Sequence, residues 1–387
     1  MKFTKENLNL ENGLSKEWLI TNGIGGFSSS TIIGANTRKY HGLLIAPLTP
    51  PARRFLILSK LDESLETRGR KYDLCKEYIS HGYNYQESFE KAYVPIFKYK
   101  AGGVEISKII CMEYGKNTVV VYYKIKTGTA KAKLTLAPVV NFRDFHTMNT
   151  DHNFDLKQEI KDNKVKMIID NNAQTPIYMH LSEGKYIEHN NDIFKNMFYI
   201  EEEKRGFYPE ENHSVPGVYE VEIPARQEKE ISFICSLENN IEEIDSKKVI
   251  SSEIERLEKL FNNSLLIDIR NEKKTKEELE NEKLIKTYLL AGDNFIVNRP
   301  SFNLHTIIAG YPWFLDWGRD SLIAFEGLLL IPRRFEIAKE VLLTMVRDTK
   351  FGLVPNGYSG YDNRPLYNSS DASLLLFEQV QKYIDYT

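Results

Sequence analysis

The spacing of apolar residues changes partway along the chain, and this change limits the fold more than any other feature of the sequence. From about residue 15 to 240, apolar and polar residues alternate in short runs such as Thr118–Lys126, with turn-forming clusters between the runs. Alternation with a period of two is typical of strands that bury one face. The remaining strand-like runs are 131–136, 163–170, 176–182, 197–203, 217–224 and 230–238. Many strands without intervening helices predict an antiparallel β-sandwich.

Beyond residue 240, apolar residues recur at three- and four-residue intervals, which is the spacing of helices. The expected helices are a charged segment over 241–261 and then 279–296, 320–330, 333–349 and 371–387. No strand-like segment separates them, so the C-terminal half is predicted to be all α. The sequence therefore predicts a sandwich over 1–240, a helical linker over 241–274, and the first helices of a larger helical array over 275–387.

Composition excludes several classes of protein. The 387 residues carry a net charge of −3 without a basic stripe, which argues against nucleic acid as a partner. No run approaches the roughly 18 apolar residues that a membrane-spanning helix needs, and the N-terminus lacks the apolar core of a signal peptide. The three cysteines are widely separated and match neither a disulfide framework nor a zinc motif. We expect a cytoplasmic protein with no membrane association, no metal and no cofactor.

A glycine-rich segment, Thr21–Phe27, has two interpretations. It superficially resembles a phosphate-binding loop, but it lacks the glycine spacing of such loops, and the residues that follow it read as a strand. A glycine-rich β-turn is the favoured interpretation.

The segment Asn36–Gly42 places Arg38, Lys39, Tyr40 and His41 directly before an apolar strand. These polar side chains suit either a surface that binds a sugar or a buried, hydrogen-bonded corner of the sandwich. The structural interpretation is favoured, and the sequence leaves the role of this segment open.

The loop 309–320 is the most informative segment. It contains two of the three tryptophans, Trp313 and Trp317, together with Arg319 and Asp320, just before a predicted helix. Aromatic rings stack on the apolar faces of sugars, and carboxylates and guanidinium groups bind adjacent hydroxyls. A ligand site is favoured here, although the position of Asp320 also allows it to be the N-cap of the helix.

A second loop repeats this composition over 356–362 and ends near Asp371, again at a position that suits an N-cap. The chain has neither the spacing of a serine-hydrolase nucleophile nor the histidine pair of a zinc protease.

Two long segments resemble a known family. Residues 17–63, beginning EWLITNGIGGF, resemble the start of the N-terminal domain of bacterial and archaeal glycogen-debranching enzymes. Residues 310–383, beginning GYPWFLDWGRD, resemble the opening of their amylo-α-1,6-glucosidase domain. The two segments occur in the family's order.

This resemblance implies a β-sandwich followed by an (α/α)6 barrel. It also implies hydrolysis of the α-1,6-linked glucose at a branch point of glycogen or of a branched α-glucan oligosaccharide. A pair of carboxyl groups would carry out this reaction with inversion at the anomeric carbon. In related glucosidases, the aspartate of a Trp-X-Arg-Asp motif holds the terminal glucose. The expected substrate-binding residues are therefore Trp313, Trp317, Arg319, Asp320 and Asp371, while the catalytic acid and base are expected beyond Thr387.

The chain departs from the family in length. A closed (α/α)6 barrel has six pairs of helices, and only about four helices are predicted here. We therefore expect an incomplete barrel and a fragment with little or no hydrolase activity of its own. Two alternatives stay open, a glucoamylase-like exo-glucosidase that acts on α-1,4 ends and a non-catalytic glycan-binding protein. The oligomeric state is left open as well.

Overall fold

The computed structural model describes residues 1–75, 82–150, 155–169, 174–266, 274–359 and 364–387. The chain divides into two compact units. The sandwich unit consists of Met1–Ile20, Phe27–Ala46 and Phe55–Ser251, and the helical unit consists of Thr21–Gly26, Pro47–Arg54 and Ser252–Thr387. The predicted domain limits at residues 240 and 274 stay predictions, and residues 267–273 of the predicted linker lie outside the described residues.

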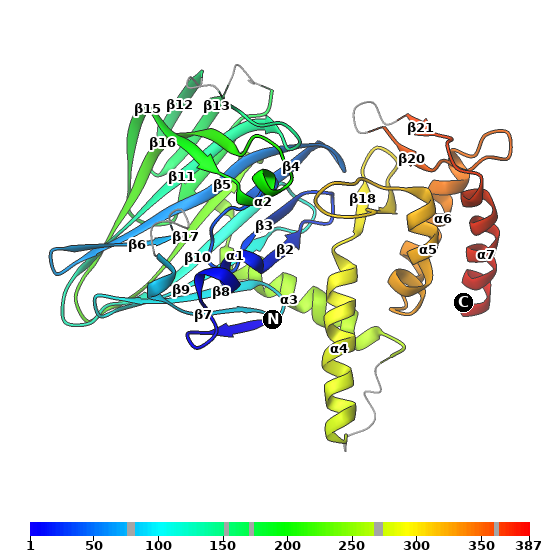
Figure 1. Cartoon of the computed structure of the whole chain (residues 1–387), viewed down its shortest axis with the longest axis horizontal. Coiled ribbons are helices and arrows are strands. Elements are labelled where there is room, and N and C mark those ends of the chain that lie inside the picture. Colours follow the sequence, from blue (N-terminus) through cyan, green and yellow to red (C-terminus); the bar gives the residue numbers. More distant parts are fainter. Residues whose placement is uncertain (76–81, 151–154, 170–173, 267–273, 360–363) are drawn as a thin grey trace. The chain divides into compact units, whose positions relative to one another are not determined.

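Two large antiparallel sheets form the predicted sandwich (Figure 1). The first sheet has the strand order β1 (Lys2–Thr4), β7 (Gln86–Lys91), β8 (Pro95–Ala101), β9 (Val104–Met112), β10 (Thr118–Lys126), β17 (Glu228–Ser236), β14 (Ile177–Leu181), β13 (Lys164–Ile169), β12 (Leu156–Lys161). The second has the order β15 (Lys185–Phe198), β16 (Glu210–Ile223), β11 (Ala132–Asp144), β5 (Ala52–Thr67), β4 (Gly42–Thr49), β3 (Phe27–Thr31), β2 (Glu17–Thr21), with β6 (Arg70–Cys75) paired to β5. Short helices α1 (Leu10–Ser15) and α2 (Ile200–Lys204) and the 3-10 turns Gly82–Tyr85 and Ile241–Glu243 accompany the strands.

The alternation in the sequence explains how the sheets pack. On β9, buried residues such as Val104, Ile106 and Ile110 alternate with more exposed ones. They join Leu65 and Leu134 of the second sheet in one apolar cluster. Because one face of each sheet contributes to the same cluster, the two sheets stabilise each other by burying apolar surface.

The helical unit contains α4 (Lys276–Asp293), α5 (Gly318–Phe325), α6 (Phe335–Arg347) and α7 (Asp371–Tyr386), shown in yellow to red in Figure 1. Helix α3 (Ser246–Asn263) spans the division between the units, and a π-helical turn, Glu326–Leu330, continues α5. Apolar residues from α5, α6 and α7 pack into one cluster that includes Phe325, Val341 and Ala372. The predicted helices near 320–330, 333–349 and 371–387 are therefore present.

The prediction that the C-terminal half is all α was wrong at two hairpins. The first pairs β18 (Ile296–Arg299) with β19 (Leu304–Ile307), and the second pairs β20 (Gly357–Tyr358) with β21 (Pro365–Leu366). The β-branched pair Ile296-Val297 disfavours a helix, and Pro300 cannot continue one. Helix α4 ends at Asp293, before these residues, with Asn294 as its C-cap.

The strand predicted over 197–203 was also wrong in its second half. Strand β15 ends at Phe198, and helix α2 follows with Glu201, Glu202 and Glu203 in its first turn. Carboxylates near a helix N-terminus interact favourably with the helix dipole, which explains why this charged segment is helical.

None of the helices within the described residues combines the length and the apolar character that crossing a bilayer requires.

Candidate functional site

The loop that precedes α5 is folded back on itself by its own backbone. The amide of Ala309 donates to the carbonyl of Leu315 at 2.8 Å, and the amide of Phe314 donates to the carbonyl of Gly310 at 2.8 Å. These two bonds hold the ends of the loop close together. This loop, 309–317, is called the aromatic loop below.

Three large aromatic side chains of the aromatic loop are exposed. Trp313, Phe314 and Trp317 are 39%, 50% and 38% exposed. The rings of Phe314 and Trp317 meet edge to face, with centroids 6.2 Å apart. Exposed apolar side chains that occur together often mark a binding site, and such rings offer the stacking faces that sugars use.

The first turn of α5 is fixed by a close backbone contact. The amide of Gly318 donates to the carbonyl of Asn356 at 2.7 Å, and Trp317 forms a β-bridge with Gly357. A Cβ atom on Gly318 would lie 2.2 Å from the carbonyl oxygen of Pro355, so only glycine fits at this position.

This contact sets where the helix begins. Trp317 is the N-cap residue, and α5 starts at Gly318. Asp320 is therefore the third helical residue, so its alternative role as N-cap is wrong. Both Arg319 and Asp320 are exposed in the first turn. The carboxylate of Asp320 is thus exposed next to the guanidinium-bearing residue Arg319 in the chain.

Asp371 comes to the same place from a distant part of the sequence. Its Oδ2 lies 3.1 Å from Nε of Arg319, and the two side chains are 42% and 57% exposed. The hydroxyl of Ser369 also donates to the Asp371 carboxylate. This hydrogen bond lowers the pKa of Asp371, and the charge of Arg319 adds to the effect. The N-cap of α7 is Ser370, so the capping role suggested for Asp371 is wrong.

The second loop supports the first through amide side chains. Oδ1 of Asn356 accepts from the backbone of Arg319 at 3.4 Å, and its Nδ2 donates to Oδ1 of Asn368 at 3.0 Å. The two loops that the sequence singled out separately therefore meet at the start of α5. Residues 360–362 of the second loop lie outside the described residues.

Of the five predicted substrate-binding residues, the structure joins two by a direct contact, Arg319 and Asp371. Trp317 and Asp320 lie in the same short segment as Arg319, and Trp313 lies four positions before Trp317. Their role in binding a substrate stays a prediction.

Sequence reasoning missed a buried ion pair below the loop. The guanidinium of Arg299 donates to both carboxylate oxygens of Asp316 at 2.9 and 3.0 Å, and both residues are buried. Arg299 also lies 4.5 Å from the ring centroid of Tyr358. Asp316 therefore holds the loop rather than facing a ligand. The only signal in the sequence was an arginine that ends the apolar run at β18.

The segment Asn36–Gly42 forms a buried corner of the sandwich unit. The side chain of Asn36 donates to the carbonyl of Ser59 at 3.2 Å, and the amide of Thr37 donates to Nδ1 of His41 at 3.0 Å. Arg38 pairs with Glu17 at 2.8 Å. These contacts favour the structural interpretation of the segment over a sugar-binding surface.

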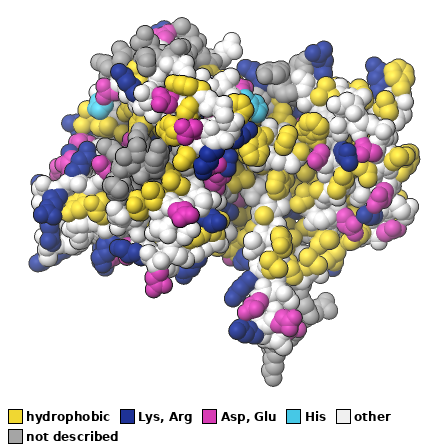
Figure 2. All heavy atoms as spheres, in the orientation of Figure 1, with side chains coloured by type: hydrophobic (Ala, Val, Ile, Leu, Met, Phe, Trp, Pro, Cys, Tyr) yellow, Lys and Arg dark blue, Asp and Glu magenta, His cyan; other side chains and the backbone are white. Residues whose placement is uncertain are grey.

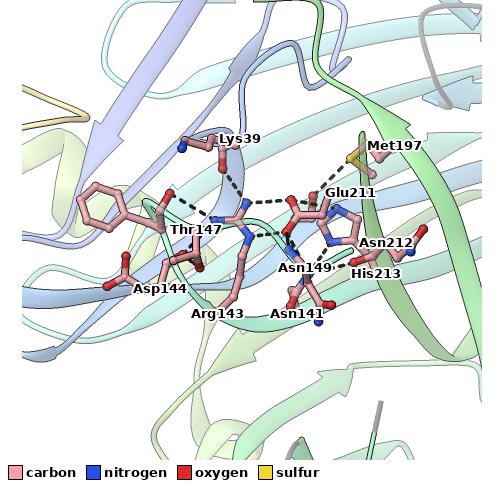
Figure 3. A network of polar contacts seen from close by, with 12 residues as sticks. Lys39, Asn141, Arg143, Asp144, Thr147, Asn149, Met197, Glu211, Asn212 and His213 are labelled. Atoms are coloured by element: carbon pink, nitrogen blue, oxygen red, sulfur yellow. Dashed lines mark hydrogen bonds and ion pairs between the residues drawn. The ribbon is translucent and has the colours of Figure 1, made fainter. Parts of the chain in front are cut away.

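A network of charged and polar groups lies next to this corner (Figure 3). The guanidinium of Arg143 pairs with the carboxylate of Glu211, and its Nη2 donates to the carbonyl of Lys39 at 2.7 Å. Tyr199 donates to Glu211 at 2.7 Å, and its hydroxyl lies 3.1 Å from Nε2 of His213. Burial lowers the pKa of His213 to about 4. Burial also tends to raise the pKa of Glu211, but the positive charge of Arg143 lowers it, and the net result is a pKa below the usual value.

The glycine-rich segment Thr21–Phe27 contains a turn, as favoured from the sequence. Oδ1 of Asn22 accepts from the amides of Ile24 and Gly26 at 3.2 and 2.8 Å. Gly23 and Gly25 have φ values of 71° and 95°, which glycine adopts at little cost. The side chain of Asn22 thus already occupies two of the amides that a phosphate would need, which argues against phosphate binding.

Two family models match the chain in the order of its two units. The model described as glycogen debranching enzyme N terminal matches residues 16–230. The model described as amylo-alpha-1,6-glucosidase matches residues 290–387 and therefore contains the aromatic loop and the Arg319–Asp371 pair.

Individual proteins are similar over different extents. The glycogen debranching enzyme of Saccharomyces cerevisiae is 37% identical over 90 residues, which are 22% of this chain and 6% of the yeast protein. A putative kojibiose phosphorylase from the human microbiome shares the fold, with a TM-score of 0.52, 10% identity, and coverage of 99% of this chain and 55% of that chain. A bacterial glucoamylase solved with acarbose has a TM-score of 0.47 and 14% identity, with coverage of 97% and 55%. The chain therefore spans about half the length of these two solved structures and a small part of the yeast enzyme.

Proposed function

The chain belongs to the glycogen debranching enzyme family, and from that premise we propose that it carries the sandwich and part of the catalytic barrel of a glycoside hydrolase. The whole protein would remove α-1,6-linked glucose at the branch points of glycogen or of a branched α-glucan oligosaccharide. A cytoplasmic location and the domain limits 1–240, 241–274 and 275–387 belong to the same proposal.

The observation that carries the proposal is the arrangement at the start of α5. The exposed rings of Trp313 and Trp317 lie in the loop that leads to α5. In the first turn of α5, the exposed guanidinium of Arg319 pairs with the exposed carboxylate of Asp371. The carboxylate of Asp320 is exposed next to Arg319 in the chain. A glucose unit needs an apolar wall for its ring face and charged acceptors and donors for adjacent hydroxyls. These five residues supply both, so we assign them to a glucose-binding subsite.

The chemistry would require two further carboxyl groups. In an inverting glycosidase, one carboxylic acid protonates the leaving oxygen and a carboxylate on the opposite face activates water. In our proposal, the residues of the aromatic loop and α5 hold the terminal glucose, and the acid and base come from segments beyond Thr387. The 387-residue chain would then bind glycan without appreciable turnover.

Exposed apolar side chains on the helices support an incomplete (α/α)6 barrel. Figure 2 shows hydrophobic side chains gathered on the surface of the helical unit. Large apolar residues that are exposed on α4 to α7 are Leu279, Leu284, Tyr288, Ile323, Leu343, Val346, Leu374, Phe377 and Ile384. Helices that are apolar on more than one side usually pack against further elements. Additional helices of the barrel would bury these faces.

Two assays test the proposal. Glucose release from a phosphorylase limit dextrin should be robust for the full-length protein and nearly absent for the 387-residue chain. Robust turnover by the 387-residue chain would overturn the assignment of acid and base.

Panose should quench the tryptophan fluorescence of the 387-residue chain, and Asp320→Ala should weaken this binding. Panose binding that is unaffected by Asp320→Ala would remove Asp320 from the subsite.

The same experiments separate the alternatives. If the full-length protein hydrolyses maltotriose faster than panose or isomaltose, it is an α-1,4 exo-glucosidase. If it sediments with glycogen but releases no glucose from any of these substrates, it is a glycan-binding protein.

A further inference from the structure

Arg54, near the start of β5, reaches the aromatic loop from a position about 260 residues earlier in the sequence. Its Nη1 donates to the carbonyl of Pro312 at 3.2 Å and to that of Phe314 at 3.1 Å. The guanidinium carbon lies 4.8 Å from the ring centroid of Tyr311. The segment Pro47–Arg54 belongs to the same compact unit as the loop. One side chain therefore contacts three residues of the loop.

We propose that Arg54 is a positioning residue, which holds the aromatic loop in the conformation that presents Trp313 and Trp317 to a sugar. The importance of this role for glycan binding rests on the proposed function, whereas the effect of Arg54 on the loop does not. Arg54 touches no substrate in this proposal and acts through the backbone on both sides of Trp313.

The surroundings of Arg54 explain why the residue is specifically an arginine. Its side chain is fully buried, and a buried cation is costly unless hydrogen bonds and nearby negative charge compensate for lost water. Two carbonyl oxygens accept from one nitrogen, while the guanidinium carbon lies within cation–π distance of the Tyr311 ring. Lysine concentrates its charge on a single nitrogen, so it would reproduce these separate contacts less well than the broad guanidinium does.

The far end of the loop has a second anchor. Asp316 is fixed by the buried guanidinium of Arg299, as described above. Arg54 thus contacts 311–314, the segment that contains Trp313, and Arg299 fixes Asp316, which directly precedes Trp317. Without Arg54, the first anchor is lost and the carbonyls of Pro312 and Phe314 lose a charged donor. We expect the loop to open locally rather than the whole unit to unfold.

Tryptophan fluorescence can follow this loop directly. The chain has three tryptophans, and Trp18 is buried in the sandwich unit, so a Trp18→Phe background leaves emission from Trp313 and Trp317 alone. In this background, acrylamide quenching of the 387-residue chain should increase for Arg54→Met. The ceiling is about 2.5-fold, because the rings are already 39% and 38% exposed. Arg54→Lys should give a smaller increase.

A matched control removes another arginine of the same unit. Arg334 pairs with Asp293, a residue outside the aromatic loop, and Arg256 keeps Asp293 paired when Arg334 is lost. Arg334→Met should lower resistance to urea without changing the quenching of the two tryptophans. If Arg54→Met behaves like this control, with unchanged quenching, Arg54 only stabilises the fold and the proposal is overturned.

Two further variants keep the test decisive if Arg54→Met does not fold. Tyr311→Leu removes the stacking surface and leaves Arg54 in place, so it should also increase quenching. Unchanged quenching in both Tyr311→Leu and Arg54→Lys would overturn the proposal.

Panose titration separates this proposal from the proposed function. If the parent chain binds panose, Arg54→Met should weaken binding by about tenfold, since misplaced contact groups lose much of their binding energy. If the parent chain does not bind panose, the glucose subsite fails, and the quenching data still decide whether Arg54 positions the loop.

Discussion

The Arg143–Glu211 pair of the sandwich unit and the Arg319–Asp371 pair of the helical unit join the same kinds of group in opposite surroundings. The side chains of the first pair are 5% and 0% exposed, while those of the second are 57% and 42% exposed. Arg143 and Glu211 are also tied to backbone and to other buried side chains, such as Tyr199.

This difference separates the structural role of the first pair from the binding role that we propose for the second. A buried pair whose hydrogen bonds are satisfied from within has no free capacity for a ligand, and removing one partner leaves the other charge uncompensated. An exposed pair contributes little to stability, and its groups can exchange water for the hydroxyls of a sugar.

The largest effect is expected at the buried pair. Arg143→Met should lower the free energy of unfolding by about 3–5 kcal/mol, because the Glu211 carboxylate would stay buried without its cation. Urea unfolding followed by circular dichroism measures this loss. A loss below about 1 kcal/mol would contradict a structural role for the network.

Loss of Asp320 should affect activity far more than stability. In the full-length protein, Asp320→Ala should lower kcat/KM for glucose release about 10- to 100-fold, which corresponds to one or two lost charge-assisted hydrogen bonds. Glu336→Ala is the matched control, because Glu336 is also an exposed acidic residue in the first turn of a helix. Equal effects of the two substitutions would assign Asp320 to the helix rather than to the substrate.

The buried network should also make stability depend on pH. Burial lowers the pKa of His213 from 6.5 to about 4, opposed by the nearby Glu211 and supported by Arg143. Between pH 6.5 and pH 4 the unfolded chain therefore binds a proton at His213 that the folded chain does not. The free energy of unfolding is thus highest above pH 6.5 with respect to this group, and it declines as the pH falls toward 4. Between pH 7 and 5 it should fall by about 2 kcal/mol.

His213→Gln removes the titrating group and serves as the comparison for that measurement. Urea unfolding at pH 7, 6 and 5 should show a weaker pH dependence for the variant than for the parent chain. Lys60 and Asp62 also lie close enough to influence His213. Parallel curves for the two proteins would show that His213 does not cause the dependence.

The smallest effect on stability is expected at the exposed pair. Arg319→Met should change the free energy of unfolding by no more than about 1 kcal/mol, since exposed ion pairs are weak and screened by salt. The same urea assay measures it beside Arg143→Met. A loss comparable with that of Arg143→Met would erase the distinction between the two pairs.

The fold was predictable where one local signal dominates. The run Thr118–Lys126 is so rich in β-branched and aromatic residues that the predicted strand coincides with β10. At 197–203 two signals compete, since aromatic residues favour a strand and three successive glutamates suit the start of a helix. The structure places the boundary between them, at Tyr199.

The candidate site was predictable in part. The unusual composition of the aromatic loop indicated a binding segment, and the resemblance to a family assigned roles to Arg319 and Asp320. The contact of Arg319 with Asp371 joins residues that are far apart in the chain, so no local pattern could predict it. The same is true of Arg54, which the sequence presents only as one of two adjacent arginines before a strand.

The spacing of apolar residues was enough to predict a β-rich and a mainly helical half, because it decides which backbone conformation can bury those residues. The composition of residues 309–320 was enough to single out a candidate sugar-binding segment, because so many aromatic and charged side chains fall close together there. Which charged groups are buried and which are exposed could not be read from the sequence. Burial depends on contacts between distant segments, and it is burial that makes Arg143 and Glu211 part of the framework and leaves Arg319 and Asp371 open to a ligand.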